Sequence, residues 1–151
     1  MADHMDDLGM DTAIAEARAG RDEGGIPIGS ALIVDGAVVG RGHNRRVQLG
    51  SPTLHGEMDA LENAGRLPAD TYRKATIYTT LSPCDMCSGA ILLYGIPRVV
   101  IGENRTFLGA EEHLAARGVE IVVRDDDRCV ALMTEFIAEH PLLWNEDIGE
   151  D

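Results

Sequence analysis

Two short motifs constrain this chain most, because any fold must bring them together: His55-Gly56-Glu57 and Pro83-Cys84-Asp85-Met86-Cys87. One imidazole and two thiols give three metal ligands, one fewer than a closed structural zinc site uses. Three protein ligands with water or hydroxide in the fourth position are typical of catalytic zinc. A carboxylate two residues after the histidine is the kind of group that moves protons, which indicates Glu57 as the catalytic acid and base. The motifs predict one Zn²⁺ per chain, with the ligands His55, Cys84 and Cys87.

Other interpretations of the thiol pair stay open at this point. A lone C-x-x-C also occurs in redox dithiols and in half of a zinc finger. A redox dithiol has no need of the histidine motif, and a structural zinc site would need a fourth ligand. Candidates for that ligand are Cys129, His43, His113 and His140, none with a partner two to four residues away. We expect Cys129 to be a buried apolar residue and His43 to be structural.

Composition limits the class of protein. With 151 residues, 44% hydrophobic and 26% charged, the chain suits one globular domain over residues 1–151. No apolar run approaches the ~20 residues that span a membrane, and the acidic start lacks a secretory pattern, so we expect a cytoplasmic protein. The net charge of −13 opposes binding to nucleic acid. Arg41, Arg45 and Arg46 are the nearest approach to a basic cluster, so a small neutral substrate is favoured.

Helical and strand patterns alternate along the chain, which predicts helices covering a sheet. Asp35-Gly36 between two apolar runs is a hairpin signal and makes the sheet mixed. The fold class expected is α/β, a three-layer α/β/α sandwich with a mixed sheet of about five strands. Helices are predicted over residues 9–22, 55–64, 84–94, 111–117 and 126–139. Strands are predicted over 30–34, 37–47, 75–81, 98–102 and 119–123, with an irregular to weakly helical tail over 141–151.

On these motifs, the chain resembles the cytidine deaminase superfamily, and within it fungal-type zinc-dependent cytosine deaminase. The H-x-E…P-C-x-x-C pattern is the signature of zinc deaminases. The resemblance covers about residues 24–150 and includes segments 25–29, 40–44, 53–57, 61–63, 78–87, 94–98, 102–104 and 146–150. The C-terminal segment 146–150, with Trp144 before it, is the more specific part, because a tail has little packing reason to match.

The resemblance implies a role for each substrate-binding residue. Asn44 and the Gly56 backbone N–H would hold the pyrimidine O2, and Glu57 would bind ring N3 and carry protons. The Ser82 carbonyl and the Asp147 carboxylate would receive the amine. Apolar contacts to the base are implied for Ile28, Phe107 and Trp144. The resemblance implies a homodimer that hydrolyses free cytosine to uracil and ammonia. The charge and the lack of a long apolar run predict that it binds neither nucleic acid nor membrane.

Simpler structural interpretations and other substrates remain open. Asn44 could be a turn residue, Asp147 a solvated charge, and Ser82 a helix N-cap, and the two aromatic residues could be ordinary core. Other substrates are guanine, isocytosine, a triazine-like ring or, against the charge, a tRNA adenosine. A non-catalytic zinc-binding protein would lack the acid. The chain departs from the fungal pattern at Asn145, Arg105-Thr106 and Met58-Asp59. The first two departures lie near the presumed lid and leave the substrate's ring size or 5-substituent open.

Overall fold

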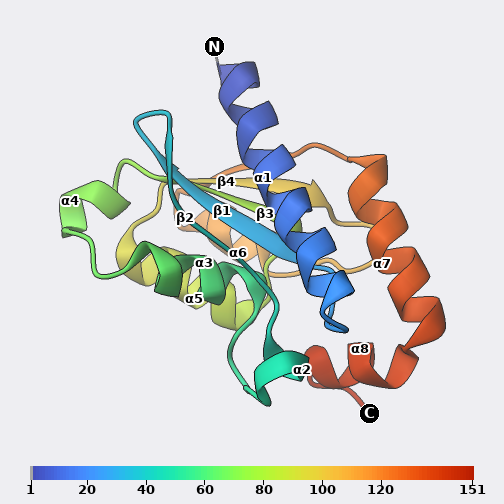
Figure 1. Cartoon of the computed structure of the whole chain (residues 1–151). Coiled ribbons are helices and arrows are strands. Elements are labelled where there is room, and N and C mark those ends of the chain that lie inside the picture. Colours follow the sequence, from blue (N-terminus) through green and yellow to red (C-terminus); the bar gives the residue numbers. More distant parts are fainter. Residues whose placement is uncertain (1) are drawn as a thin grey trace.

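The structure, a computed structural model, describes residues 2–151 and has a five-stranded mixed sheet with helices on both faces (Figure 1). The strands are β1 (Gly29–Val34), β2 (Ala37–His43), β3 (Thr76–Leu81), β4 (Arg98–Glu103) and β5 (Glu120–Val123). The helices are α1 (Ala2–Asp22), α2 (Arg46–Leu49), α3 (Gly56–Ala64), α4 (Ala69–Tyr72), α5 (Asp85–Tyr94), α6 (Glu111–Ala116), α7 (Asp127–Glu139) and α8 (Pro141–Asp147). The predicted fold class is confirmed.

The strand order is β2-β1-β3-β4-β5. Strand β1 is antiparallel to both β2 and β3, whereas β3, β4 and β5 are parallel. The predicted hairpin joins β1 to β2 through Asp35 and Gly36, whose φ angles are 51° and 78°. Two central residues with positive φ match the twist of a two-residue hairpin. The parallel strands need crossovers, which α5 and α6 provide.

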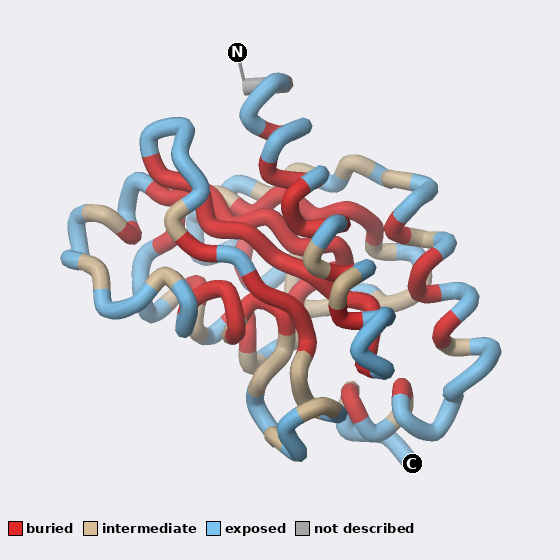
Figure 2. The backbone as a smooth tube through the Cα atoms, in the orientation of Figure 1, coloured by how far each residue is buried: buried red, intermediate tan, exposed pale blue. Residues whose placement is uncertain are grey.

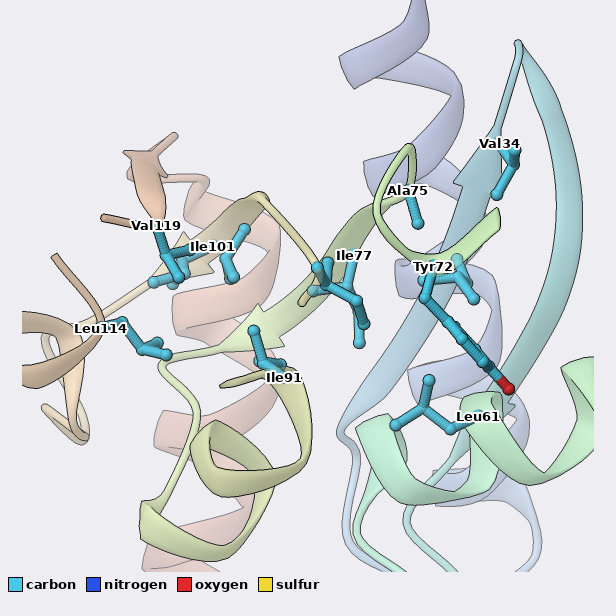
Figure 3. Packing of buried hydrophobic residues seen from close by; sticks show 12 residues of the cluster. Val34, Leu61, Tyr72, Ala75, Ile77, Ile91, Ile101, Leu114 and Val119 are labelled. Carbon is cyan, nitrogen blue, oxygen red and sulfur yellow. The ribbon is translucent and has the colours of Figure 1, made fainter. Parts of the chain in front are cut away.

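The sheet buries both of its faces, since neighbouring side chains on a strand point to opposite sides. Ile33 and Val100 contribute to the core under α1 and α7, which also contains the buried Cys129 expected from the sequence. Ile77 and Ile101 contribute to the core under α3, α5 and α6, seen from close by in Figure 3. Strands β1, β3 and β4 are accordingly the most continuously buried part of the chain, whereas the outer turns of the helices are exposed (Figure 2).

Helix α3 lies very close to the edge strand β2 because two glycines face it. A Cβ atom on Gly40 would lie 2.5 Å from the Ala60 carbonyl oxygen, and one on Gly42 would lie 2.4 Å from Asp59 Oδ2. Real Cβ atoms essentially never come that close. The two glycines therefore bring the helix that follows His55 directly against the strand that leads to Asn44.

Two predicted boundaries are wrong, and the C-terminal tail is more regular than predicted. Helix α1 begins at Ala2 rather than near residue 9, and its acidic first half forms ion pairs with Arg98, Arg124 and Arg128. Strand β2 ends at His43 instead of Val47, because the Asn44 side chain accepts the Arg46 backbone N–H at 3.0 Å and turns the chain. The tail contains a regular helix, α8, with proline in its first turn.

Within residues 2–151, no helix combines the length and apolar character needed to cross a lipid bilayer.

Candidate active site

The three predicted metal ligands converge at the start of two helices. His55 is the N-cap residue of α3, and Cys84 is the N-cap residue of α5. The Nδ1 atom of His55 lies 3.3 Å from Cys84 Sγ and 3.6 Å from Cys87 Sγ. The three ligand atoms all lie within 4.8 Å of one another, which is close enough for a single ion to contact all of them.

The electrostatics of this cluster favour a divalent cation. The Cys87 thiol donates a hydrogen bond that lowers the pKa of Cys84 to about 4, against the opposing effect of burial, and His55 adds to the lowering. Burial would lower the pKa of His55, but hydrogen bonds to Asp147 and Cys84 raise it to about 10. Two anionic groups thus face the imidazole, where a cation would replace the proton. One imidazole and two thiols are a donor set that suits zinc.

Glu57 lies in the first turn of α3 and is 4% exposed. Burial, together with the negative charge of Cys84, raises the pKa of Glu57 to about 7. A carboxyl group with that pKa can both accept and donate a proton near neutral pH, which is the requirement for general acid–base chemistry.

The C-terminal helix α8 brings Asp147 to the other side of the cluster. Its Oδ2 atom lies 3.3 Å from His55 Nε2, and Asn44 Nδ2 donates to its Oδ1 atom at 3.2 Å. Burial would raise the pKa of Asp147, but hydrogen bonds from His55, Arg46 and Asn44 hold it below its usual value. Asp147 is 6% exposed, so the interpretation as a solvated tail charge is wrong.

A small pocket opens beside the thiols. Its lining residues are Ile28, His55, Glu57, Leu81, Ser82, Cys84, Phe107, Trp144, Asp147 and Ile148. The rings of Phe107 and Trp144 meet edge to face, with centroids 5.8 Å apart. Gly56 and Asn44 are buried next to this pocket and do not line it. Sequence reasoning missed Leu81 and Ile148 as lining residues, although both stand directly beside residues it singled out.

Ser82 precedes α5, but it does not act as its N-cap. Cys84 fills that position, and its sulfur accepts the Cys87 backbone N–H at 3.5 Å. The Ser82 hydroxyl instead donates to Glu111 at 2.6 Å and accepts the Gly109 N–H at 2.9 Å. Ser82 therefore holds the loop that carries Phe107 against the end of β3.

The three arginines near residue 45 are each paired with a carboxylate. Arg41 pairs with Glu16, Arg45 with Asp59, and Arg46 with Glu146 and Asp147. Arg46 is a site residue that the sequence did not reveal, because its partners lie about 100 positions further along the chain. These ion pairs neutralise the nearest approach to a basic cluster.

Comparison with known proteins identifies the family. Residues 3–103 match the sequence profile of the cytidine and deoxycytidylate deaminase zinc-binding region. The chain belongs to this zinc-dependent deaminase family. The deaminase is 59% identical to cytosine deaminase from Candida albicans over 146 residues, which are 96% of this chain and 97% of that protein. It is 38% identical to tRNA-specific adenosine deaminase from Bacillus subtilis over 100 residues, which are 65% of this chain and 62% of that protein.

Solved structures share the architecture of the deaminase. A structure from a study of tRNA:A34 deaminases superposes with a TM-score of 0.72 at 28% identity, covering 83% of this chain and 98% of that one. A guanine deaminase from Nitrosomonas europaea superposes with a TM-score of 0.68 at 24% identity, covering 85% of this chain and 82% of that one. The second similarity concerns the fold alone.

Proposed function

We propose that this deaminase hydrolyses free cytosine to uracil and ammonia. The observation that carries the proposal is the 59% identity to a cytosine deaminase across 96% of the chain. The family profile ends at residue 103, whereas Phe107, Trp144 and Asp147 line the pocket from beyond it. The similarity to the cytosine deaminase covers 96% of the chain, so it extends beyond the family profile into the part of the chain that holds these three pocket residues.

In this proposal, one set of residues binds the substrate, and a different residue, Glu57, transfers the protons. When bound by His55, Cys84 and Cys87, zinc supplies a water nucleophile that is deprotonated near neutral pH. Glu57 accepts a proton from the attacking water and gives it to ring N3, then accepts the proton of the hydroxyl added to the ring and gives it to the departing amine, so that water and cytosine give uracil and ammonia. Asp147 and the Ser82 carbonyl receive the amine.

The remaining contacts hold and enclose the ring. Asn44 and the Gly56 N–H lie beside the pocket rather than in its lining, and in this proposal they reach the pyrimidine O2 from there. The base lies against Ile28, and Phe107 and Trp144 exclude water from it. The pocket lining includes the apolar side chains of Ile28, Leu81, Phe107 and Trp144, and an apolar lining favours a neutral heterocycle over a charged substrate.

Two of the departures from the fungal pattern, Arg105 and Asn145, lie outside the pocket lining. The Arg105 side chain pairs with Asp125, and Asn145 Nδ2 donates to the Asp151 carbonyl at 3.1 Å. Neither Arg105 nor Asn145 lines the pocket, so neither alters its shape directly. A polynucleotide substrate is disfavoured by the net charge of −13 and by the ion pairs of the three arginines near residue 45.

A substrate panel tests the proposal. Purified, zinc-loaded protein is incubated with cytosine, isocytosine, guanine and an aminotriazine, and ammonia release is measured. We expect the highest kcat/KM with cytosine. Ammonia release from another ring, with none from cytosine, would reject cytosine as the substrate. Tight retention of tRNA with the protein on a filter at low salt would show that the protein binds nucleic acid, against the proposal.

We also infer that residues 1–151 act as one deaminase domain, in a homodimer located in the cytoplasm. The dimer is supported by exposed apolar side chains at the end of α5, where Leu93 is 75% exposed and Tyr94 is 42% exposed. Sedimentation should give twice the chain mass, and L93E should shift the protein toward the monomer. A monomer at micromolar concentration would contradict the dimer, and recovery of the enzyme in a membrane or secreted fraction would contradict the location.

A further inference from the structure

A buried acid outside the predicted site, Asp59, contacts the residues on both sides of Asn44. Its Oδ2 atom accepts the His43 backbone N–H at 3.0 Å and the Arg45 Nε–H at 2.9 Å. Asp59 is 5% exposed, so solvent does not compete strongly for either hydrogen bond. A single carboxylate oxygen thus bridges the segment that presents Asn44.

Asp59 also belongs to the helix that begins at the metal cluster. Its backbone N–H donates to the His55 carbonyl at 2.9 Å, one helical turn away, and Glu57 lies two residues before it. The close approach of α3 to β2 at Gly42 is what allows the carboxylate to reach the end of the strand. The position of Asn44 is therefore coupled to the helix that carries the proton-transfer residue.

Among the hydrogen bonds of the described residues, those of Asp59 link this segment to a side chain of α3, and the Arg45 backbone N–H donates to the Leu54 carbonyl at 2.9 Å, just before that helix. The His43 ring lies between two carboxylates near the end of α1, with Nδ1 2.8 Å from Glu16 and Nε2 2.9 Å from Glu23. The Asn44 backbone N–H donates to the Ile28 carbonyl at 2.9 Å. The contacts of the His43 ring and the Asn44 N–H fix the segment to α1 and to the start of β1, but not to the helix of the metal cluster.

We propose that Asp59 is a positioning residue, which sets Asn44 for substrate binding by holding the backbone of residues 43–45 against α3. This role rests on the proposed function, in which Asn44 contacts the pyrimidine. Asp59 touches neither the substrate pocket nor the metal ligands' side chains, so its effect passes through the two flanking residues. Loss of the carboxylate should weaken binding more than it slows the chemical step.

The kinetic test compares Asp59→Ala with Asp59→Asn, because an asparagine oxygen can still accept both hydrogen bonds. Asp59→Ala should raise KM for cytosine by about 10- to 100-fold with a smaller change in kcat, since misplacement by about 1 Å costs that much. Asp59→Asn should recover most of this loss, and both variants should keep one zinc per chain. A KM for Asp59→Ala within twofold of the wild-type value would overturn the proposal.

The matched control is Asp6→Ala, which removes an equally buried acid that pairs with Arg98 on another part of the molecule. This variant should keep the wild-type KM, and an equal rise in its KM would overturn the specific role of Asp59. If Asp59→Ala does not fold, Arg45→Met removes one of the two hydrogen bonds from a partly exposed residue. It should raise KM by about 3- to 10-fold, and an unchanged KM would overturn the proposal.

Amide hydrogen exchange separates this proposal from the assignment of cytosine. Exchange at residues 43–45 should become at least about tenfold faster in Asp59→Ala and stay unchanged in Asp6→Ala. This readout needs no substrate, so a wild-type protein inactive on cytosine would reject the proposed function alone. Unchanged exchange at residues 43–45 would reject the positioning role whichever base is the substrate.

Discussion

Asp6 and Glu57 are equally buried carboxyl groups in opposite electrostatic surroundings. Asp6 is 5% exposed and accepts two hydrogen bonds from Arg98, at 2.7 and 2.8 Å, and one from the Tyr78 hydroxyl at 2.7 Å. Glu57 is 4% exposed, and no arginine or lysine in the described chain pairs with it. The charges that act on it are those of the Cys84 thiolate, which raises its pKa, and of the His55 imidazole, which lowers it.

The two environments shift the pKa values of these carboxyl groups in opposite directions. The hydrogen bond from Arg98 is the main cause that lowers the pKa of Asp6, whereas burial raises the pKa of Glu57 to about 7. A paired carboxylate is a fixed charge that contributes to stability, and an unpaired one is available for proton transfer at neutral pH. Burial alone therefore does not define a functional acid; what distinguishes Glu57 from Asp6 is that no arginine or lysine pairs with it in the described chain.

The largest expected effect is a loss of catalytic activity when Glu57, but not Asp6, is replaced. Glu57→Gln keeps the shape of the side chain but cannot carry protons, so kcat should fall by about 10²- to 10⁴-fold or more. Zinc content, measured by atomic absorption, should stay at one per chain. Asp6→Asn is the control, with kcat near the wild-type value. Near-normal turnover by Glu57→Gln would remove the proton-transfer role.

The second effect is a loss of stability when Asp6 loses its partner, Arg98. Arg98→Met leaves Asp6 buried without its cation, so the free energy of unfolding should fall by about 3 kcal/mol, at the lower end for a buried pair because Arg98 is partly exposed. Urea unfolding measures this loss, while kcat at a temperature where the variant is folded should be unchanged. A loss below about 1 kcal/mol would place this pair with ordinary surface pairs.

The third test follows the free energy of unfolding of metal-free protein as a function of pH. Asp6 and Glu57 should change this free energy with pH in opposite directions. Because the pKa of Asp6 is lower in the folded state, its contribution is fully present above the unfolded value, near 4, and is lost as pH falls through the folded value. Glu57 has a higher pKa when folded, so stability is lost as pH rises from about 4.5 to about 7.

Unfolding free energies at a series of pH values check these signs. The advantage of wild type over Asp6→Asn should shrink below pH 4. Glu57→Gln should gain stability relative to wild type as pH rises from about 4.5 to about 7. The same trend in both variants would show that the two carboxyl groups do not differ as proposed.

The smallest effect is expected for an exposed ion pair of the same helix as Asp6. Arg128 contacts Asp11 at 3.0 Å, and the two side chains are 45% and 61% exposed. Arg128→Ala, which also removes a bond to Asp126, should lower the free energy of unfolding by about 0–1 kcal/mol, and 0.5 M salt should remove part of the difference. A loss comparable to that of Arg98→Met would mean that burial does not control the strength of these pairs.

Much of the fold was predictable because its signals are local. The Asp35-Gly36 turn, the alternating apolar strands and the glycines that end α3 and α5 act within a few residues. The start of α1 was missed because the residues that stabilise it lie far away, as with Asp6 and Arg98, 92 positions apart. The short helix α2 was missed because a side chain, Asn44, ends the strand.

The candidate site divides in the same way. The sequence by itself predicted the three metal ligands, which the structure brings together, and pointed to Glu57, since two short motifs carry the spacing of these side chains. Only the tertiary structure decided that Asp147 is a buried partner of Asn44, 103 residues away, and that Arg46 pairs with it. It alone also placed Asp59 across the backbone that carries Asn44. Local geometry is set by residues that are neighbours in the sequence. The charges around a buried group depend instead on which distant segments of the chain pack against it.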